Sequence, residues 1–352
     1  MFIGLDKQTI KPTVVSIDYE KLISCCNATV STEGTIYPIY NHKRATEQPI
    51  NHIHINDNTM FNRLTIGTYK ADRGIGLFCL LDISKMGVDD CNLVPYTLEG
   101  FRTYTDKCIT YIEERYGIVL NNNSYKGEVM EMNMTIILED KFNEYGYLLE
   151  LMAKLSPSKK RYKTELYYDK SNEITGIKLK NGSVQKKIYD KKKQMETEKE
   201  IKIVLDKEYM RIEDTLLHQN KIKDVFGTYN LSEITDTAVK NYLIKSINED
   251  LIIPLEKHIS AGNKLLLKAA KEEKKTNNKK WIQSFIISAL TMKIKDTPLL
   301  VDKQQILDTI KAIDKKNYNR SIKRAEADLN KLNGYIGNID KLNEIKFKCD
   351  ID

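Results

Sequence analysis

A tyrosine flanked by lysines, with a carboxylate farther along the chain, is the feature of this sequence best suited to chemistry. Tyr189 lies between Lys187 and Lys191, and Glu213 follows Arg211 inside the next apolar segment. A tyrosine hydroxyl has a pKa of about 10, so as a nucleophile it needs nearby cations and usually a metal ion on the target phosphate. The grouping therefore predicts cleavage and rejoining of a phosphodiester bond.

Two neighbouring tyrosines, Tyr167 and Tyr168, compete with Tyr189 as the nucleophile. On a strand they point to opposite faces, so only one of them can reach a common site. Tyr189 is preferred, and Tyr168 is kept as a second catalytic candidate. Without chemistry, the same segment is an amphipathic hairpin with half-buried rings and solvated lysines, or its rings stack on unpaired bases.

The positive charge of the chain is concentrated in the same region. The net charge is +7, and residues 159–211 alone contain 16 Lys and Arg against 9 Asp and Glu, so the remainder sums to zero. Such clustering is typical of nucleic-acid binding, because each neutralised phosphate releases condensed counterions. An exposed lysine-rich hairpin is the alternative. The candidate DNA contacts are Lys186, Lys192, Lys193 and Arg211.

Composition predicts a folded cytoplasmic protein without a membrane partner. At 352 residues and 41% hydrophobic content, the chain is long enough for two domains with apolar cores. No run of about 18 uncharged apolar residues occurs, and charged residues come too early for a signal peptide. The six cysteines contain no C-x-x-C pair, which predicts reduced thiols. No phosphate-binding loop or zinc-spaced Cys/His set is present.

The periodicity of apolar residues predicts an α+β fold with a mainly antiparallel sheet, flanking helices and a helical second part. Helical spacing covers residues 97–117 and 141–155, and residues 41–60 are expected to form a long loop. After Gly227 the pattern becomes helical throughout, which predicts domains at 1–227 and 228–352. Strands are expected at 12–18, 28–40, 63–70, 76–86 and 127–140, around Leu166, Ile177 and Ile188, and at 207–217.

Five segments in order resemble the gene II type replication initiators of filamentous phages and their relatives among rolling-circle plasmid replication proteins. The first is similar to that family's Ser-x-x-Lys-x-x-x-Gly-x-Asn motif, with its glycine at Gly87 and its asparagine at Asn92. The third is similar to the segment of the nucleophilic tyrosine, here Tyr189, and the fourth to an Arg-hydrophobic-Glu strand. The segments are GLFCLLDISKMGVDDCN, GEVMEMNMTIILE, KKIYDKKKQ, YMRIEDTLLHQNKIKDVFG and KKNYNRSIKRAEADLNKLNGY.

The resemblance implies an HUH-like nuclease domain that nicks and rejoins one DNA strand through a phosphotyrosine, which initiates rolling-circle replication. Mg²⁺ or Mn²⁺ would be held by Glu213 with Glu131 or Asn133. Lys187 and Lys191 would stabilise the charge on the phenolate and the phosphate.

The implied partners are single-stranded and duplex origin DNA, with a host helicase and polymerase. The C-terminal segment is similar to a Lys-x-Ser-Tyr-x-Arg helix through Lys316, Tyr318 and Arg320, and it implies DNA contacts from Tyr318 and Arg320. A conjugative relaxase uses the same chemistry and is an alternative.

Two departures from the family fall in the metal site. Its Arg-x-Asp-x-Thr strand reads Glu131-Met132-Asn133-Met134-Thr135, so an asparagine replaces an expected carboxylate and the arginine is lost. Mg²⁺ and Mn²⁺ prefer charged oxygen ligands, so another carboxylate would have to compensate. A non-catalytic origin-binding or regulatory protein of the same fold is therefore an alternative function.

Glu213 is the strongest candidate carboxylate, because an unpaired charge inside an apolar run is costly. A bridge to a lysine is its alternative explanation. His52 and His54 form the His-hydrophobe-His pattern of HUH nucleases, in which alternate strand residues bind one metal ion. They lie in an Asn/Asp-rich segment, where an exposed short strand is the alternative.

Overall fold

The computed structural model describes most of the chain, and its compact units are described separately. One unit comprises Met1–Ile136 and Lys180–Leu243, and the other comprises Ile137–Leu179 and Ile244–Asp352. The described residues are 1–25, 37–39, 50–57, 59–71, 74–84, 93–121, 125–156, 160–197, 206–276, 280–315, 318–330 and 339–351.

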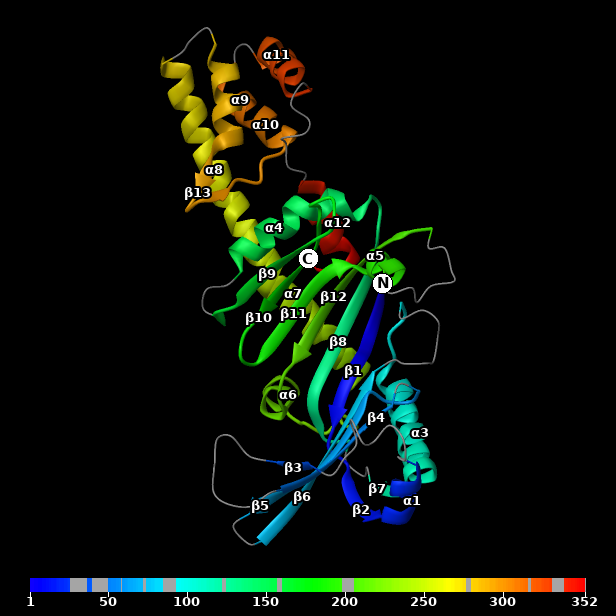
Figure 1. Ribbon diagram of the computed structural model, residues 1–352. Helices are drawn as coiled ribbons and strands as arrows, with labels where there is room; N and C mark the ends of the chain where they lie inside the picture. The colour runs from blue at the N-terminus through cyan, green and yellow to red at the C-terminus, as the bar shows by residue number, and fades with distance from the viewer. Residues whose placement is uncertain are drawn as a thin grey trace. The chain divides into compact units, whose positions relative to one another are not determined.

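The first unit is built on a sheet with the strand order β3-β4-β5-β6-β1-β8-β12-β11 (Figure 1). Every one of these pairs with a known register is antiparallel. β2 (Thr13–Ile17) and β7 (Ile118–Asn121) form a separate antiparallel pair. The sheet strands are β1 (Phe2–Ile10), β3 (Tyr37–Ile39), β4 (Ile50–Asn56), β5 (Arg63–Ala71), β6 (Gly74–Ser84), β8 (Gly127–Leu138), β11 (Val184–Asp190) and β12 (Glu208–Leu216).

Alternation along the central strands divides their side chains between an apolar and a polar face. On β8, Met130, Met132 and Met134 are fully buried in the core. Glu131, Asn133 and Thr135 alternate with these methionines and therefore point to the other face. This polar face carries the candidate site.

Helix α3 (Leu98–Tyr116) begins and ends with well-defined caps. The Thr97 side chain accepts a hydrogen bond from the Gly100 N–H, as an N-cap does. At the other end Gly117 adopts φ 70°, which a residue with a side chain rarely tolerates. The other helices of this unit are α1 (Tyr19–Cys25), α5 (Lys191–Thr197), α6 (Gln219–Phe226) and most of α7 (Asp236–Ile247).

The second unit packs helices around an apolar cluster that includes Trp281, Phe285 and Ile306. Among the described residues, no helix of the chain is both long and apolar enough to cross a membrane. The elements of this unit are η1 (Phe142–Tyr145), α4 (Gly146–Leu155), β9 (Lys163–Tyr168), β10 (Ile174–Lys180), the π-helix η3 (Asn248–Ile252), α8 (Ile253–Thr276), α9 (Trp281–Thr291), β13 (Lys293–Ile294), β14 (Thr297–Pro298), α10 (Lys303–Ile313), α11 (Tyr318–Asn330) and α12 (Ile339–Lys348).

The structure confirms an α+β fold with a large antiparallel sheet, and it corrects the local prediction at two places. β4 occupies part of the segment predicted as a long loop, because the alternation INHIHIN pairs with β5. β1 was not predicted at all, although it becomes a central strand. After Gly227 the chain is mainly helical, but α7 lies mostly in the first unit, while α8 to α12 share the second unit with residues 137–179.

The buried carboxylate of Asp57 fixes α3 against the end of β4. It accepts hydrogen bonds from the Tyr116 and Tyr111 hydroxyls at 2.8 and 3.0 Å and from the N–H groups of Thr59 and Met60. Burial acts to raise the pKa of Asp57, but these hydrogen bonds outweigh it, and the pKa lies below its ordinary value.

Asp57→Asn should lower the free energy of unfolding at pH 7 by about 2 kcal/mol, because it removes a charged acceptor of several hydrogen bonds. A lowered carboxylate pKa contributes stability above the unfolded pKa of about 4, and this contribution is lost as pH falls. Urea unfolding should therefore show a smaller difference between the variant and the wild type at pH 3 than at pH 7. The control is Asp106→Asn, an exposed carboxylate that also accepts from a tyrosine. An equal deficit at pH 3 would contradict the charge explanation.

Candidate metal centre

Three carboxylates from three adjacent strands meet on the polar face of the sheet. They are Asp6 on β1, Glu131 on β8 and Glu213 on β12, and one oxygen from each lies within 4.8 Å of the others. Carboxylate oxygens at such spacing are the ligands that hard divalent cations prefer. This acidic triad can hold a metal ion.

Strand register explains how the triad forms. Along β1 the pairing with β8 shifts between Leu5 and Lys7, which gives Asp6 the position of a bulged residue. Bulges redirect a side chain, and here Asp6 comes to lie on the polar face. Two residues along β8 from Glu131, Asn133 pairs with Gly4 of β1.

Gly4 is needed because another segment passes directly over it. A Cβ atom at this position would lie 2.1 Å from the Tyr96 carbonyl oxygen. The backbones of Leu5 and Tyr96 exchange hydrogen bonds of 2.8 and 3.0 Å. The segment before α3 is therefore fixed beside the strand that provides Asp6.

The Arg211 side chain does not face solvent but pairs with the carboxylate of Asp6. This side chain is fully buried and lies 3.4 Å from Asp6 Oδ2. It also donates to Thr135 Oγ1 at 2.9 Å and to the Leu93 carbonyl at 2.7 Å. Arg211 was expected to bind DNA, but in this structure it positions a triad carboxylate.

Glu213 connects the triad to the tyrosine predicted as the nucleophile. The Tyr189 hydroxyl donates to Glu213 Oε1 at 2.5 Å, and Lys187 Nζ donates to Oε2 at 3.0 Å. Antiparallel pairing sets this geometry, because Lys187 lies opposite Glu213 and Tyr189 lies opposite Arg211. The lysine bridge considered for Glu213 is thus present, together with the acidic triad.

Proximity of like charges perturbs the titration of the site. Burial first, and then the negative charge of Glu213, raises the pKa of Glu131 to about 7. Burial and the charge of Glu213 also raise the pKa of Tyr189 well above its ordinary value. Thr215 donates a hydrogen bond to Glu131 at 3.0 Å, which opposes the shift. A proton or a cation must therefore compensate the charge of the triad.

Asn133 supplies a further observation that fits a bound cation. Its side chain is fully buried, and neither its amide oxygen nor its amide nitrogen has a hydrogen-bond partner among the described residues. Buried amides without partners are costly, and an amide oxygen is an acceptable ligand for a hard cation. Asp6 provides the carboxylate that the sequence reading lacked when Asn133 replaced an aspartate.

The flanking lysines occupy different environments. Lys186 is fully buried in an ion pair with Asp214, away from the triad. Lys191 is also buried and donates to Gln194. Lys192 pairs with Glu208 at 2.8 Å, and Lys193 is half-buried in α5. Of the two lysines predicted to be catalytic, only Lys187 contacts the triad.

The remaining predicted residues lie elsewhere or outside the described residues. Tyr168 is 51% exposed on β9, in the second unit. β4, which carries His52 and His54, is separated from β8 by β5, β6 and β1, and the structure does not describe their side chains. Arg320 is exposed on α11, whereas the Tyr318 side chain, Gly87, Asn92 and Lys316 lie outside the description.

Sequence reasoning missed Asp6, which lies in the run FIGLDKQTI. The signal was available, since Asp6 is an acidic residue inside an apolar segment, as is Glu213. Because β1 was not predicted to be a strand, this carboxylate was not considered.

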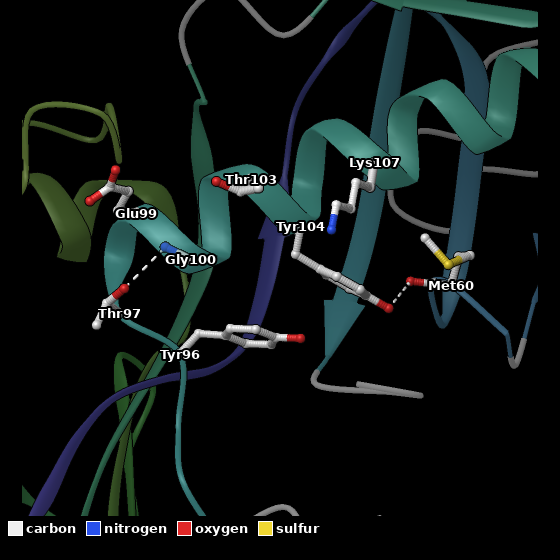
Figure 2. A pocket seen from close by; sticks show the side chains of 8 residues that line it. All are labelled: Met60, Tyr96, Thr97, Glu99, Gly100, Thr103, Tyr104 and Lys107. Carbon is white, nitrogen blue, oxygen red and sulfur yellow. Dashed lines mark hydrogen bonds between the residues drawn. The ribbon is translucent and has the colours of Figure 1, made fainter. Parts of the chain in front are cut away.

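A separate pocket of about 600 Å³ lies along α3 (Figure 2). The rings of Tyr96 and Tyr104 stack there with centroids 5.6 Å apart, and the Tyr104 hydroxyl donates to the Met60 carbonyl. Glu99 and Lys107 provide its charges. Within the described part of the chain, this pocket assembles no group of three metal-ligating side chains, so the candidate chemistry lies at the triad.

A scan of protein families finds none that matches, and a search of curated proteins finds no match.

Replacement of Glu213 by Gln, or of Asp6 by Asn, should weaken Mn²⁺ binding at least tenfold, because each change removes a charged ligand. Electron paramagnetic resonance of free Mn²⁺ measures this directly. Glu208→Gln, on the same strand but outside the triad, is the matched control. Equal affinities for all four proteins would show that the triad binds no cation.

Mn²⁺ binding should also depend on pH. Glu131 holds a proton below about pH 7 and must release it to bind a cation. The apparent affinity should therefore fall about fivefold as pH decreases from 7 to 6, approach a tenfold fall per unit below pH 6, and stay nearly constant above pH 8. In Glu131→Gln the dependence should disappear. An unchanged pH profile in this variant would contradict the assignment of the titrating group.

Proposed function

We propose that this protein cleaves and rejoins one DNA strand, with Tyr189 as the nucleophile and a divalent metal ion as the cofactor. The observation that carries the proposal is the 2.5 Å hydrogen bond from the Tyr189 hydroxyl to Glu213, itself a member of the acidic triad. A nucleophile, its proton acceptor and a candidate metal site are thus contiguous, which is the arrangement that phosphoryl transfer requires.

The bonds and protons in the proposed step balance. The Tyr189 oxygen attacks phosphorus while its proton passes to Glu213, and the bond to the 3′ oxygen breaks. The leaving oxygen takes a proton from water and becomes a free 3′-hydroxyl, from which a polymerase can extend. In the reverse direction a 3′-hydroxyl attacks the phosphotyrosine, so joining needs no ATP.

The residues that would hold Mg²⁺ or Mn²⁺ are Asp6, Glu131 and Glu213, with the amide oxygen of Asn133 beside them. When bound, the cation supplies positive charge that polarises the phosphate and favours the tyrosinate. Lys187 is about one third exposed, with a side-chain accessibility of 30%, so it can contact both Glu213 and an incoming phosphate. Arg211 keeps Asp6 in place.

The choice of DNA as the substrate rests on the basic region 159–211 and on the likeness to gene II type initiators. Initiation of rolling-circle replication is the proposed role, with origin DNA, a host helicase and a polymerase as partners. Mg²⁺ and Mn²⁺ are equally compatible with oxygen ligands.

Tyr189→Phe should abolish the covalent adduct between the protein and DNA. The assay incubates wild type with Mn²⁺ and supercoiled DNA carrying the element's own origin, followed by denaturing gels. Tyr168→Phe, which alters an exposed tyrosine outside the triad, is the matched control and should form the adduct normally. Lys187→Gln should slow adduct formation by about 10²-fold.

Other outcomes of this assay would assign the nucleophile or the function differently. An adduct from Tyr189→Phe but not from Tyr168→Phe would make Tyr168 the nucleophile. Tight origin binding without any adduct, under conditions where Mn²⁺ binds the triad, would leave the non-catalytic regulator as the function.

A further inference from the structure

Helix α11 (Tyr318–Asn330) has one face packed in the core and one face that is basic and exposed. Ser321, Ala325 and Leu329 are buried on the inner side. Their spacing of four residues places them along a single stripe. The opposite side is exposed and carries Asn319, Arg320, Lys323, Arg324 and Ala327.

The start of α11 is fixed by a buried carboxylate in the preceding connection. Asp314 accepts a hydrogen bond from Ser321 Oγ at 2.6 Å and from Lys274 Nζ of α8 at 2.9 Å. These interactions lower the pKa of Asp314 despite its burial, so its charge is maintained. At the other end, Lys303 of α10 donates to Asn330 at 2.9 Å. The exposed face is therefore held in one orientation.

The connection between α10 (Lys303–Ile313) and α11 has the length found in helix-turn-helix pairs. It comprises residues 314–317, and such pairs use turns of about three or four residues. Ala325 and Leu329 of the inner stripe of α11 belong to the same apolar cluster as Ile306 and Ile310 of α10. The second helix of such a pair is the one that enters the major groove of DNA.

The positive charge of the exposed face of α11 favours a nucleic acid as the partner. Arg320, Lys323 and Arg324 form no ion pair with any described residue, and they are the charged residues of the exposed face. Glu326 and Asp328 of the same helix are half-buried beside that face, so α11 as a whole carries a net charge of +1. Ala327 lies on the same exposed face, and its small side chain does not project beyond the basic side chains. Arginine reads guanine and asparagine reads adenine in the major groove, while lysine pairs with phosphate.

We infer that α11 is a recognition helix for duplex DNA, which presents Asn319, Arg320, Lys323 and Arg324 to the major groove. This surface is additional to the nicking chemistry, since it involves no residue of the triad. In addition to the DNA contact expected from Arg320, it assigns DNA contacts to Asn319, Lys323 and Arg324, and it places the helix in the major groove.

The test compares the full chain with the triple variant Arg320→Gln/Lys323→Gln/Arg324→Gln, using 30-base-pair duplexes with a randomised centre. Fluorescence anisotropy measures binding, and sequencing of the bound fraction measures selectivity. We expect the variant to bind at least tenfold more weakly and to lose sequence enrichment. The slope of log affinity against log salt should become shallower by about 1–3.

The matched control is Lys264→Gln/Lys268→Gln/Lys271→Gln, which removes the same charge from exposed positions on α8. It should bind within twofold of wild type. If the α11 variant also binds within twofold, or if both variants weaken equally, the recognition helix is overturned. Circular dichroism melting shows whether each variant is folded, and Arg320→Lys, which keeps the charge, should lose enrichment while keeping affinity.

The two proposals can fail separately. The α11 variant should still form the Tyr189 adduct on a single-stranded oligonucleotide that wild type cleaves, because the triad is intact. If wild type forms no adduct on any DNA but the α11 variant alone loses duplex binding, the recognition helix stands without the nicking function.

Discussion

The close approach of three carboxylates, two of them buried and one half-buried, is the constraint on which the candidate site depends. Asp6, Glu131 and Glu213 bring like charges within 4.8 Å in a setting where water screens them poorly. Arg211 and Lys187 compensate part of that charge, while burial first and then the charge of Glu213 raise the pKa of Glu131. Perturbed pKa values cluster at functional sites, and a cation that binds a protonated carboxylate displaces its proton.

The sheet accommodates these carboxylates because its apolar and polar side chains lie on opposite faces. Methionines on β8 fill the core on one side, so Glu131, Asn133 and Thr135, which alternate with them, are directed to the other side. The same alternation on β11 and β12 places Tyr189 and Lys187 beside Glu213, while Lys186 pairs with Asp214 among the apolar residues. Neighbouring lysines in one sequence run therefore have opposite environments, which charge counting alone does not reveal.

Sequence patterns predicted the α+β class, the main helices and the proximity of Tyr189, Lys187 and Glu213, because these follow from local periodicity and from one hairpin. They did not predict Asp6. Its place in the site depends on β1 lying between β6 and β8, a pairing between residues far apart in the chain. The role of Arg211 also depends on distant partners. The missing information was which strands pair when they are far apart in the sequence, and local propensities do not encode this pairing.

The origin of the triad in distant segments has a consequence for the synthesis of the protein. Asp6 and its partner Arg211 are separated by 205 residues, so the first ligand leaves the ribosome long before the last. Contacts of such sequence separation form late and slowly, because chain closure must precede them. The triad is therefore completed only after β12 has been synthesised and has paired with β8 in the sheet.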